Sequence, residues 1–209
     1  VYGPLRKGPG GTGLFETRTT NGGNSDDILY VIDRSGSMID TFHAVTYNMA
    51  LSIGSLAPRR AIGLTATTRR PRKKRFGILF FADGKPQVFN KAMLTEPTMA
   101  NRAAAAKFLE TVIPVGQTDP VAALKAAFAT LRAGQSKSRP RNQLLFLLTD
   151  GVFPDNDAVI GLVRAELKKN PHVKLCTILY GHRPPAAEAT MKMLAKLSHG
   201  VYRYVEIED

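Results

Sequence analysis

The stretch ILYVIDRSGSM, residues 28–38, decides how the rest of the chain is interpreted. An apolar run of strand length ends in an acid, Asp33, and two hydroxyls follow at two-residue spacing, Ser35 and Ser37. A strand that is apolar at nearly every residue is typical of a parallel sheet covered on both faces. In open α/β sheets, ligands bind at the carboxyl ends of such strands. The stretch therefore predicts a buried strand that ends in a polar turn at a binding site.

Strands and helices alternate along the rest of the chain. After the turn, apolar residues recur at spacings of three and four through Leu56, which predicts one buried helix face. Apolar runs predict further strands at 75–82, 87–90, 143–148, 173–180 and 201–207. Segments with helical periodicity predict helices at 98–113, 157–169 and 186–198, and another helix that starts at Pro120. A short turn before 87–90 indicates an antiparallel hairpin at the sheet edge, and Gly200 is placed to cap the last helix. The order predicts a three-layer, doubly wound (Rossmann-like) α/β fold with a mostly parallel six-stranded sheet and helices on both faces.

Composition indicates one domain with additional sequence before it. The chain has 209 residues and is 44% hydrophobic, enough for one sizeable core. Residues 1–25 are rich in glycine and predict a linker with a short edge strand at 14–19, and residues 26–209 predict the domain. No apolar run has the roughly 18 residues of a membrane span, and no signal peptide is recognised. Because the sequence starts at Val1, we expect a fragment of a longer protein, and the compartment stays open.

Positive charge is both spread over the chain and concentrated in one segment. The net charge is +12, and residues 59–75 predict an exposed basic loop inserted before the second strand. Its six clustered cations are Arg69, Arg70, Arg72, Lys73, Lys74 and Arg75. Such a run favours acidic partners or surfaces. The single cysteine, Cys176, lies in an apolar run and is interpreted as a small buried residue.

Three separate segments place oxygen-bearing side chains at the same predicted edge of the sheet. Asp33 and Asp150 each close a strand, and Thr118 lies in a loop that opens a helix. Together with Ser35 and Ser37 they offer two carboxylates and three hydroxyls. Hard oxygen ligands in this number favour Mg²⁺, with Mn²⁺ or Ca²⁺ as alternatives. The sequence therefore predicts a divalent-cation site.

These motifs, in this order, resemble the metal-ion-dependent adhesion site (MIDAS) of the von Willebrand factor type A (vWA) family. The resemblance covers residues 26–207 and implies a sheet order like 3-2-1-4-5-6. It implies that Ser35, Ser37 and Thr118 coordinate the metal through their hydroxyls. Asp33 and Asp150 would act directly or through bound water. An acidic side chain of a partner protein would take the remaining coordination position.

The resemblance predicts a non-catalytic protein-binding module that functions in adhesion or complex assembly. We expect a monomeric domain of a larger protein. Bacterial proteins often carry such domains as parts of longer chains, and a bacterial protein is expected here. Residues just beyond the strand ends are expected to form the partner-binding rim. They are Arg34, Asp40, Phe153, Asp155, His182 and Arg183.

Two alternatives remain open from the sequence. A metal-dependent phosphohydrolase would use Asp33 as nucleophile, but phosphatases of the haloacid dehalogenase type place a second acid at the position of Ser35. The other alternative is binding of nucleic acid or an anionic surface through residues 69–75. That loop is expected at the end of the sheet opposite the metal site, and no aromatic residue interleaves it for base stacking.

Overall fold

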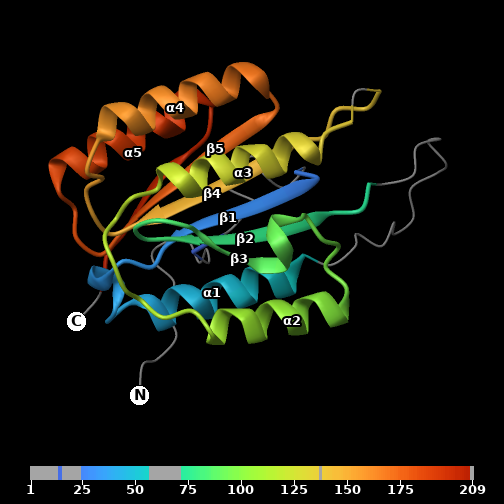
Figure 1. The fold of residues 1–209 in the computed structure, drawn as a ribbon, viewed down its shortest axis with the longest axis horizontal. Helices are drawn as coiled ribbons and strands as arrows, with labels where there is room; N and C mark the ends of the chain where they lie inside the picture. Colours follow the sequence, from blue (N-terminus) through green and yellow to red (C-terminus); the bar gives the residue numbers. More distant parts are fainter. Residues whose placement is uncertain (1–13, 16–24, 57–71, 137, 208–209) are drawn as a thin grey trace.

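The computed structural model describes residues 14–15, 25–56, 72–136 and 138–207, and these form one sheet between two layers of helices (Figure 1). The strand order is β3-β2-β1-β4-β5-β6, and within the described residues only β3 is antiparallel to its neighbour. The doubly wound prediction and its edge hairpin are therefore confirmed. The strands are β1 (Asp27–Asp33), β2 (Arg75–Phe81), β3 (Gln87–Val88), β4 (Gln143–Thr149), β5 (Val173–Tyr180) and β6 (Tyr202–Val205).

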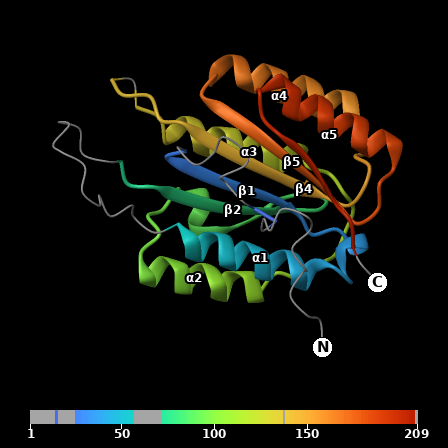
Figure 2. The ribbon, with the colours of Figure 1, turned by 180° about the vertical axis from the view of Figure 1, so that it is seen from behind.

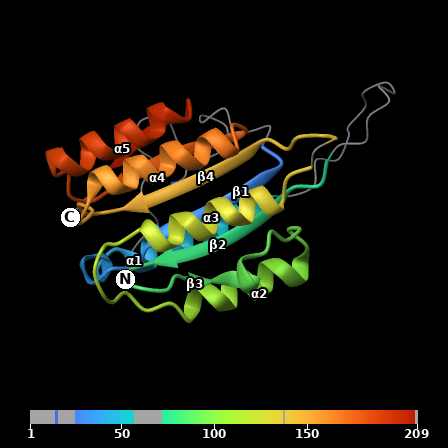
Figure 3. The same ribbon diagram turned by 45° about the horizontal axis from the view of Figure 1, so that its top comes forward.

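Each face of the sheet has its own helices and its own core (Figures 2 and 3). Helices α1 and α2 cover one face, and α3, α4 and α5 cover the other. None of the helices in the described part of the chain is long and apolar enough to cross a membrane. The helices are α1 (Phe42–Ser55), α2 (Met99–Glu110), α3 (Val121–Ala133), α4 (Asn156–Lys169) and α5 (Pro185–Leu197).

Strand β1 lies at the centre and is buried along its whole length. Alternate side chains point to opposite faces, so Tyr30 packs under α1 while Leu29 and Val31 pack under α3. Parallel pairing aligns β1 with β2 and β4 residue by residue. All three strands therefore end at one edge, where Asp33 is the last residue of β1.

Part of the predicted linker packs into the core. Leu14 and Phe15 form a turn and are 5% and 3% exposed. The Phe15 ring meets Tyr30 and Phe146 edge-on, with ring centroids 5.4 and 5.5 Å apart. The predicted edge strand does not form at Leu14 and Phe15, and residues 16–19 lie outside the described residues.

Strand β3 is shorter than predicted because the backbone enters a left-handed conformation shortly after it. The sequence predicts a strand through Asn90, but pairing ends at Val88 and a short 3₁₀ turn follows over Phe89–Ala92. Asn90, Lys91 and Ala92 have φ values of 48°, 53° and 59°. Left-handed backbone cannot continue a strand, so the prediction is wrong for the last two residues.

The end of helix α5 also differs from the expectation. The left-handed residue that terminates it is His199, with φ of 53°, rather than Gly200. The His199 and Gly200 amides donate to the carbonyls of Lys196 and Ala195. Gly200 is needed for another reason, because a Cβ there would lie 1.9 Å from the carbonyl oxygen of Leu175 in β5.

Candidate metal centre

Asp33 is held rigidly at the carboxyl end of β1. Its side chain is fully buried. One carboxylate oxygen, Oδ1, accepts a hydrogen bond from the backbone N–H of Ser35 at 2.7 Å. The other, Oδ2, accepts from the hydroxyl of Thr149 at 2.6 Å. The two bonds fix the carboxylate between the first loop and the end of β4.

The two serines join Asp33 to the second acid. The hydroxyl oxygens of Ser35 and Ser37 are 3.1 Å apart and share a hydrogen bond. The Ser37 hydroxyl donates to Oδ1 of Asp150 at 2.9 Å. Two loops that are more than a hundred residues apart in sequence therefore meet through their oxygen atoms.

The loop between α2 and α3 brings Thr118 to the same place. The Gly36 amide donates to the carbonyl of Gly116 at 3.0 Å, which ties this loop to the first one. A Cβ built on Gly151 would lie 3.6 Å from the Thr118 hydroxyl oxygen, so that hydroxyl faces the turn after Asp150. All five predicted ligands are thus gathered at one edge of the sheet.

Gly116 has a structural requirement of its own. Its φ is +91°, and a Cβ there would lie only 2.0 Å from a carboxylate oxygen of Asp83. Only glycine adopts this conformation without strain at such close approach. The loop that carries Thr118 consequently depends on Gly116 for its path.

The electrostatics of the site are unbalanced. Burial raises the pKa of Asp33 to about 6. Burial also raises the pKa of Asp150, and the hydrogen bond from Ser37 and, to a smaller extent, the nearby His182 oppose this shift. Neither carboxylate forms an ion pair with any residue that the structure describes. Buried acids without a cation are costly.

The donor set fits a hard divalent cation. Two carboxylates and three hydroxyls offer oxygen atoms alone, as Mg²⁺, Mn²⁺ and Ca²⁺ prefer. Within the described residues no group of three or more His, Cys, Asp or Glu side chains could hold a metal ion. The hydroxyls are therefore an integral part of any site built here.

Thr149 was missed by the sequence analysis. It precedes Asp150, and its hydroxyl also accepts from the Gly151 amide at 3.2 Å. Because it ends β4 beside β1, the parallel pairing brings it to Asp33. Its position at a strand end next to a predicted ligand was the available signal.

The prediction that Phe153 lies on the partner-binding rim is wrong. Phe153 is only 4% exposed and belongs to the core under α3 and α4. Its ring meets that of Phe81 edge-on at 6.5 Å. The ring packs across the end of β1 against Phe81 of β2 rather than turning into solvent. Phe153 therefore cannot touch a partner.

The other predicted rim residues are exposed or half-exposed. Several already have structural partners: Arg34 donates to the Ile113 carbonyl, Asp155 caps α4, and Arg183 pairs with Glu188. Asp40 and His182 are exposed. Contact of any of them with a partner stays a prediction.

The basic segment is less free than predicted. Arg75 is the first residue of β2, and its guanidinium pairs with Asp27 at 2.8 Å. Arg72 pairs with Asp26 at 2.8 Å, and Lys73 pairs with Glu96 at 3.0 Å. The prediction of Arg72 and Arg75 as freely exposed anion-binding residues is wrong, because each turns inward to neutralise an acid. Arg69 and Arg70 lie outside the described residues, and Lys74 is half-exposed.

The chain belongs to the von Willebrand factor type A domain family, whose model matches residues 27–208. Domains of this family are protein-interaction modules, and their MIDAS binds divalent cations. No curated protein matches the chain. The family assignment agrees with the strand order and with the motifs at the sheet edge.

Solved structures share the fold at low sequence identity. A von Willebrand factor type A protein from Catenulispora acidiphila has a TM-score of 0.70 at 16% identity, over 89% of this chain and 39% of that one. The pilus adhesin SpaC from Lactobacillus rhamnosus GG has a TM-score of 0.65 at 13% identity, over 86% and 28%. Proximal thread matrix protein 1 from the mussel byssus, with a zinc-occupied MIDAS, has a TM-score of 0.57 at 17% identity, over 85% and 41%. The chain thus spans less than half the length of each of these three proteins.

Proposed function

We propose that this domain binds a divalent cation through Asp33, Ser35, Ser37, Thr118 and Asp150, and that the bound metal captures an acidic side chain of a partner protein. The observation that carries the proposal is the pair of buried carboxylates that form no ion pair with any described residue, next to three hydroxyls. A dication would balance both charges.

Neutral ligands explain why the partner would be acidic. Three of the five proposed ligands are hydroxyls, which do not reduce the charge on the metal. If the carboxylates act partly through water, the cation stays electrophilic and favours an anionic ligand from outside. The family membership and the zinc-occupied MIDAS of the mussel protein support this proposal. Mg²⁺ is the cation that we expect, with Mn²⁺ or Ca²⁺ as alternatives.

Binding is favoured over catalysis at this site. Both oxygens of Asp33 are occupied by hydrogen bonds from Ser35 and Thr149, which suits a positioning role rather than nucleophilic attack. Ser35 stands where a phosphohydrolase of the haloacid dehalogenase type needs its second acid. The proposed function is therefore adhesion or assembly through the metal.

Calorimetric titration of the purified domain with MgCl₂ and MnCl₂ tests the proposal. We expect saturable binding by the wild type and none by Asp33→Ala. Asp157→Asn, which changes an exposed acid in the first turn of α4, is the matched control and should bind as the wild type does. Absence of heat and of any melting shift in the wild type would falsify the proposal.

A further inference from the structure

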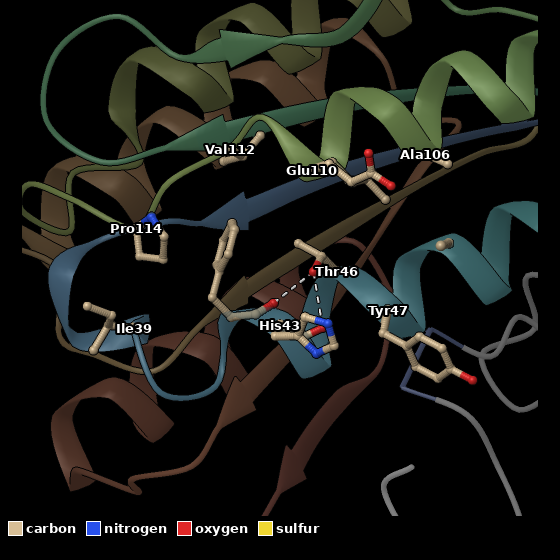
Figure 4. Close-up of a pocket in the computed structure, with 11 residues that line it drawn as sticks. Ile39, His43, Thr46, Tyr47, Ala106, Glu110, Val112 and Pro114 are labelled. Carbon is tan, nitrogen blue, oxygen red and sulfur yellow. Dashed lines mark hydrogen bonds between the residues drawn. The ribbon is translucent and has the colours of Figure 1, made fainter. Parts of the chain in front are cut away.

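An apolar groove lies between α1 and α2, next to the proposed metal centre. It has a volume of about 420 Å³. Figure 4 shows His43, Thr46 and Tyr47 of α1 on one side of it and Ala106 and Glu110 of α2 on the other. Its floor is formed by the buried side chains of Phe42, Leu109 and Val112.

Exposed apolar side chains line the groove or lie next to its lining residues in sequence. Ile39, Ile113 and Val115 are 66%, 70% and 55% exposed, and Tyr47 is 48% exposed. Single exposed apolar side chains are common, but several of them in and beside one apolar groove indicate an interaction site. These four residues therefore favour a protein ligand over plain solvent exposure.

The two loops that carry the proposed ligands also reach the groove, which Ile39 and Pro114 help to line. Ile39 follows the ligand Ser37 by two residues, and Val115 precedes the ligand Thr118 by three. The Val115 amide donates to the Arg34 carbonyl at 2.7 Å, so the two loops run side by side. Ile39 thus belongs both to the loop of the proposed ligands and to the lining of the groove.

The size and charge of the groove restrict the occupant. The α1 residues that line it run from Phe42 to Ala50, about 12 Å along the helix, which about four residues of extended chain would cover. Glu110 on its α2 side is exposed and forms no ion pair within the described residues. A cation near the apolar part of the ligand would complement it.

We infer that the partner protein presents an extended segment in which the metal-binding Asp or Glu is followed or preceded by bulky apolar residues that fill the α1–α2 groove. The inference rests on the proposed metal function and adds the second half of the recognition element. A Lys or Arg close to the apolar residues would face Glu110. The metal would then supply the acidic contact and the groove the selectivity.

A random 12-residue peptide library displayed on phage tests this inference. The library is bound to the Mg²⁺-loaded 209-residue chain and eluted with EDTA, and synthetic consensus peptides are measured by fluorescence anisotropy. We expect consensus sequences that join an acid to bulky apolar residues. Ala106→Glu, which places a charge on the exposed groove wall, should weaken their binding about tenfold or more.

Ala104→Glu is the matched control, because Ala104 is exposed on the same helix but does not line the groove. Its affinity should equal that of the wild type, and circular dichroism confirms that both variants fold. Peptides with an acid alone that bind Ala106→Glu normally would overturn the inference and leave the metal proposal intact. Failure to recover EDTA-eluted peptides from a chain that binds Mg²⁺ by calorimetry would also overturn it. So would a dimer in size-exclusion chromatography that Ala106→Glu dissociates, since a second copy would then occupy the groove.

Discussion

The two ends of β1 carry the same side chain in opposite electrostatic settings. Asp27 and Asp33 are both fully buried, and they project from the same face because they are six residues apart. Asp27 accepts hydrogen bonds from the guanidinium groups of Arg75 and Arg141 and from the amide of Gln143. Asp33 receives only neutral donors, from Ser35 and Thr149.

This difference separates an acid that the fold neutralises, Asp27, from the acid proposed as a metal ligand, Asp33. At the amino end of the strand the chain supplies the compensating cations itself, so the buried charge of Asp27 is neutralised on folding. At the carboxyl end no described side chain forms an ion pair with Asp33, which is the setting in which the proposed metal ion would supply the compensating charge. Burial alone therefore says little about the role of an acid, whereas burial without a cation indicates a binding site.

Removal of the two acids should destabilise the metal-free protein to very different extents. Asp27→Ala leaves two partly buried arginines without their anion, and we expect a loss of about 3–5 kcal/mol in the free energy of unfolding. Asp33→Ala removes an uncompensated buried charge but leaves the Ser35 amide and the Thr149 hydroxyl without their acceptor, so we expect a much smaller loss. Urea unfolding in EDTA measures both variants. Equal losses of unfolding free energy in the two variants would show that the two acids are in equivalent electrostatic settings.

The pH dependence of the free energy of unfolding should show how much the buried, ionised carboxylate of Asp33 destabilises the metal-free fold. Its pKa is raised from 3.8 to about 6 by burial, so between these values the folded state holds a proton that the unfolded state has released. Stability in EDTA should therefore fall as the pH rises from about 4 to 6, by at most about 3 kcal/mol, and then level off. Urea unfolding from pH 4 to 8 measures this.

The matched measurement uses Asp33→Asn, which keeps the shape of the side chain and removes its titration. The difference between wild type and variant isolates Asp33 from the other ionisable groups. If the difference in unfolding free energy between wild type and Asp33→Asn does not change with pH, the buried carboxylate of Asp33 does not have a raised pKa.

Addition of Mg²⁺ should stabilise the protein through the carboxyl end of β1 alone. At a concentration one hundred times the dissociation constant, the expected gain is about 2.7 kcal/mol. Thermal unfolding with and without MgCl₂ gives the shift in melting temperature. Asp33→Asn should lose this shift, and a conservative change at the exposed Asp157 should keep it. Equal shifts in all three proteins would place the metal elsewhere.

Thr149→Val should produce the smallest change. It removes the hydroxyl that bonds Asp33 at 2.6 Å while keeping the branched shape of the side chain in the strand. We expect a decrease in metal affinity equivalent to about 1 kcal/mol, measured by calorimetry. Thr177→Val in the neighbouring strand, whose hydroxyl bonds the Met191 carbonyl away from the site, is the control and should leave affinity unchanged. An equal effect of both variants would exclude a specific role for Thr149.

The arrangement of the fold could be predicted because it follows from local periodicity and chain order. Residues 28–33 are apolar at nearly every position, which already indicates a central parallel strand. Parallel strands end at one edge, so the turns after Asp33 and Asp150 were expected to meet. The structure brings Ser35, Ser37 and Thr118 to the same place, and their role as metal ligands remains a prediction.

The remaining features depend on contacts that sequence spacing does not encode. Arg72 and Arg75 look like parts of a free basic loop until the sheet register places them next to Asp26 and Asp27. Phe153 looks like a rim residue until the ring of Phe81 on β2 is seen beside it. In each case a partner distant in sequence determines whether the side chain turns inward.

The paired acids of β1 also bear on how the strand is aligned. Asp27 stands in register between Arg75 and Gln143, and both side chains bond its carboxylate. A slip of one residue would turn Asp27 and Asp33 together onto the face under α1, where Tyr30 and its apolar neighbours pack. The ion pairs of Asp27 therefore help to set the register that places Asp33 beside Thr149. The two ends of the strand are about 20 Å apart. The alignment of β1 therefore rests on contacts that the chain makes by itself, at the end of the strand that is far from the proposed metal site.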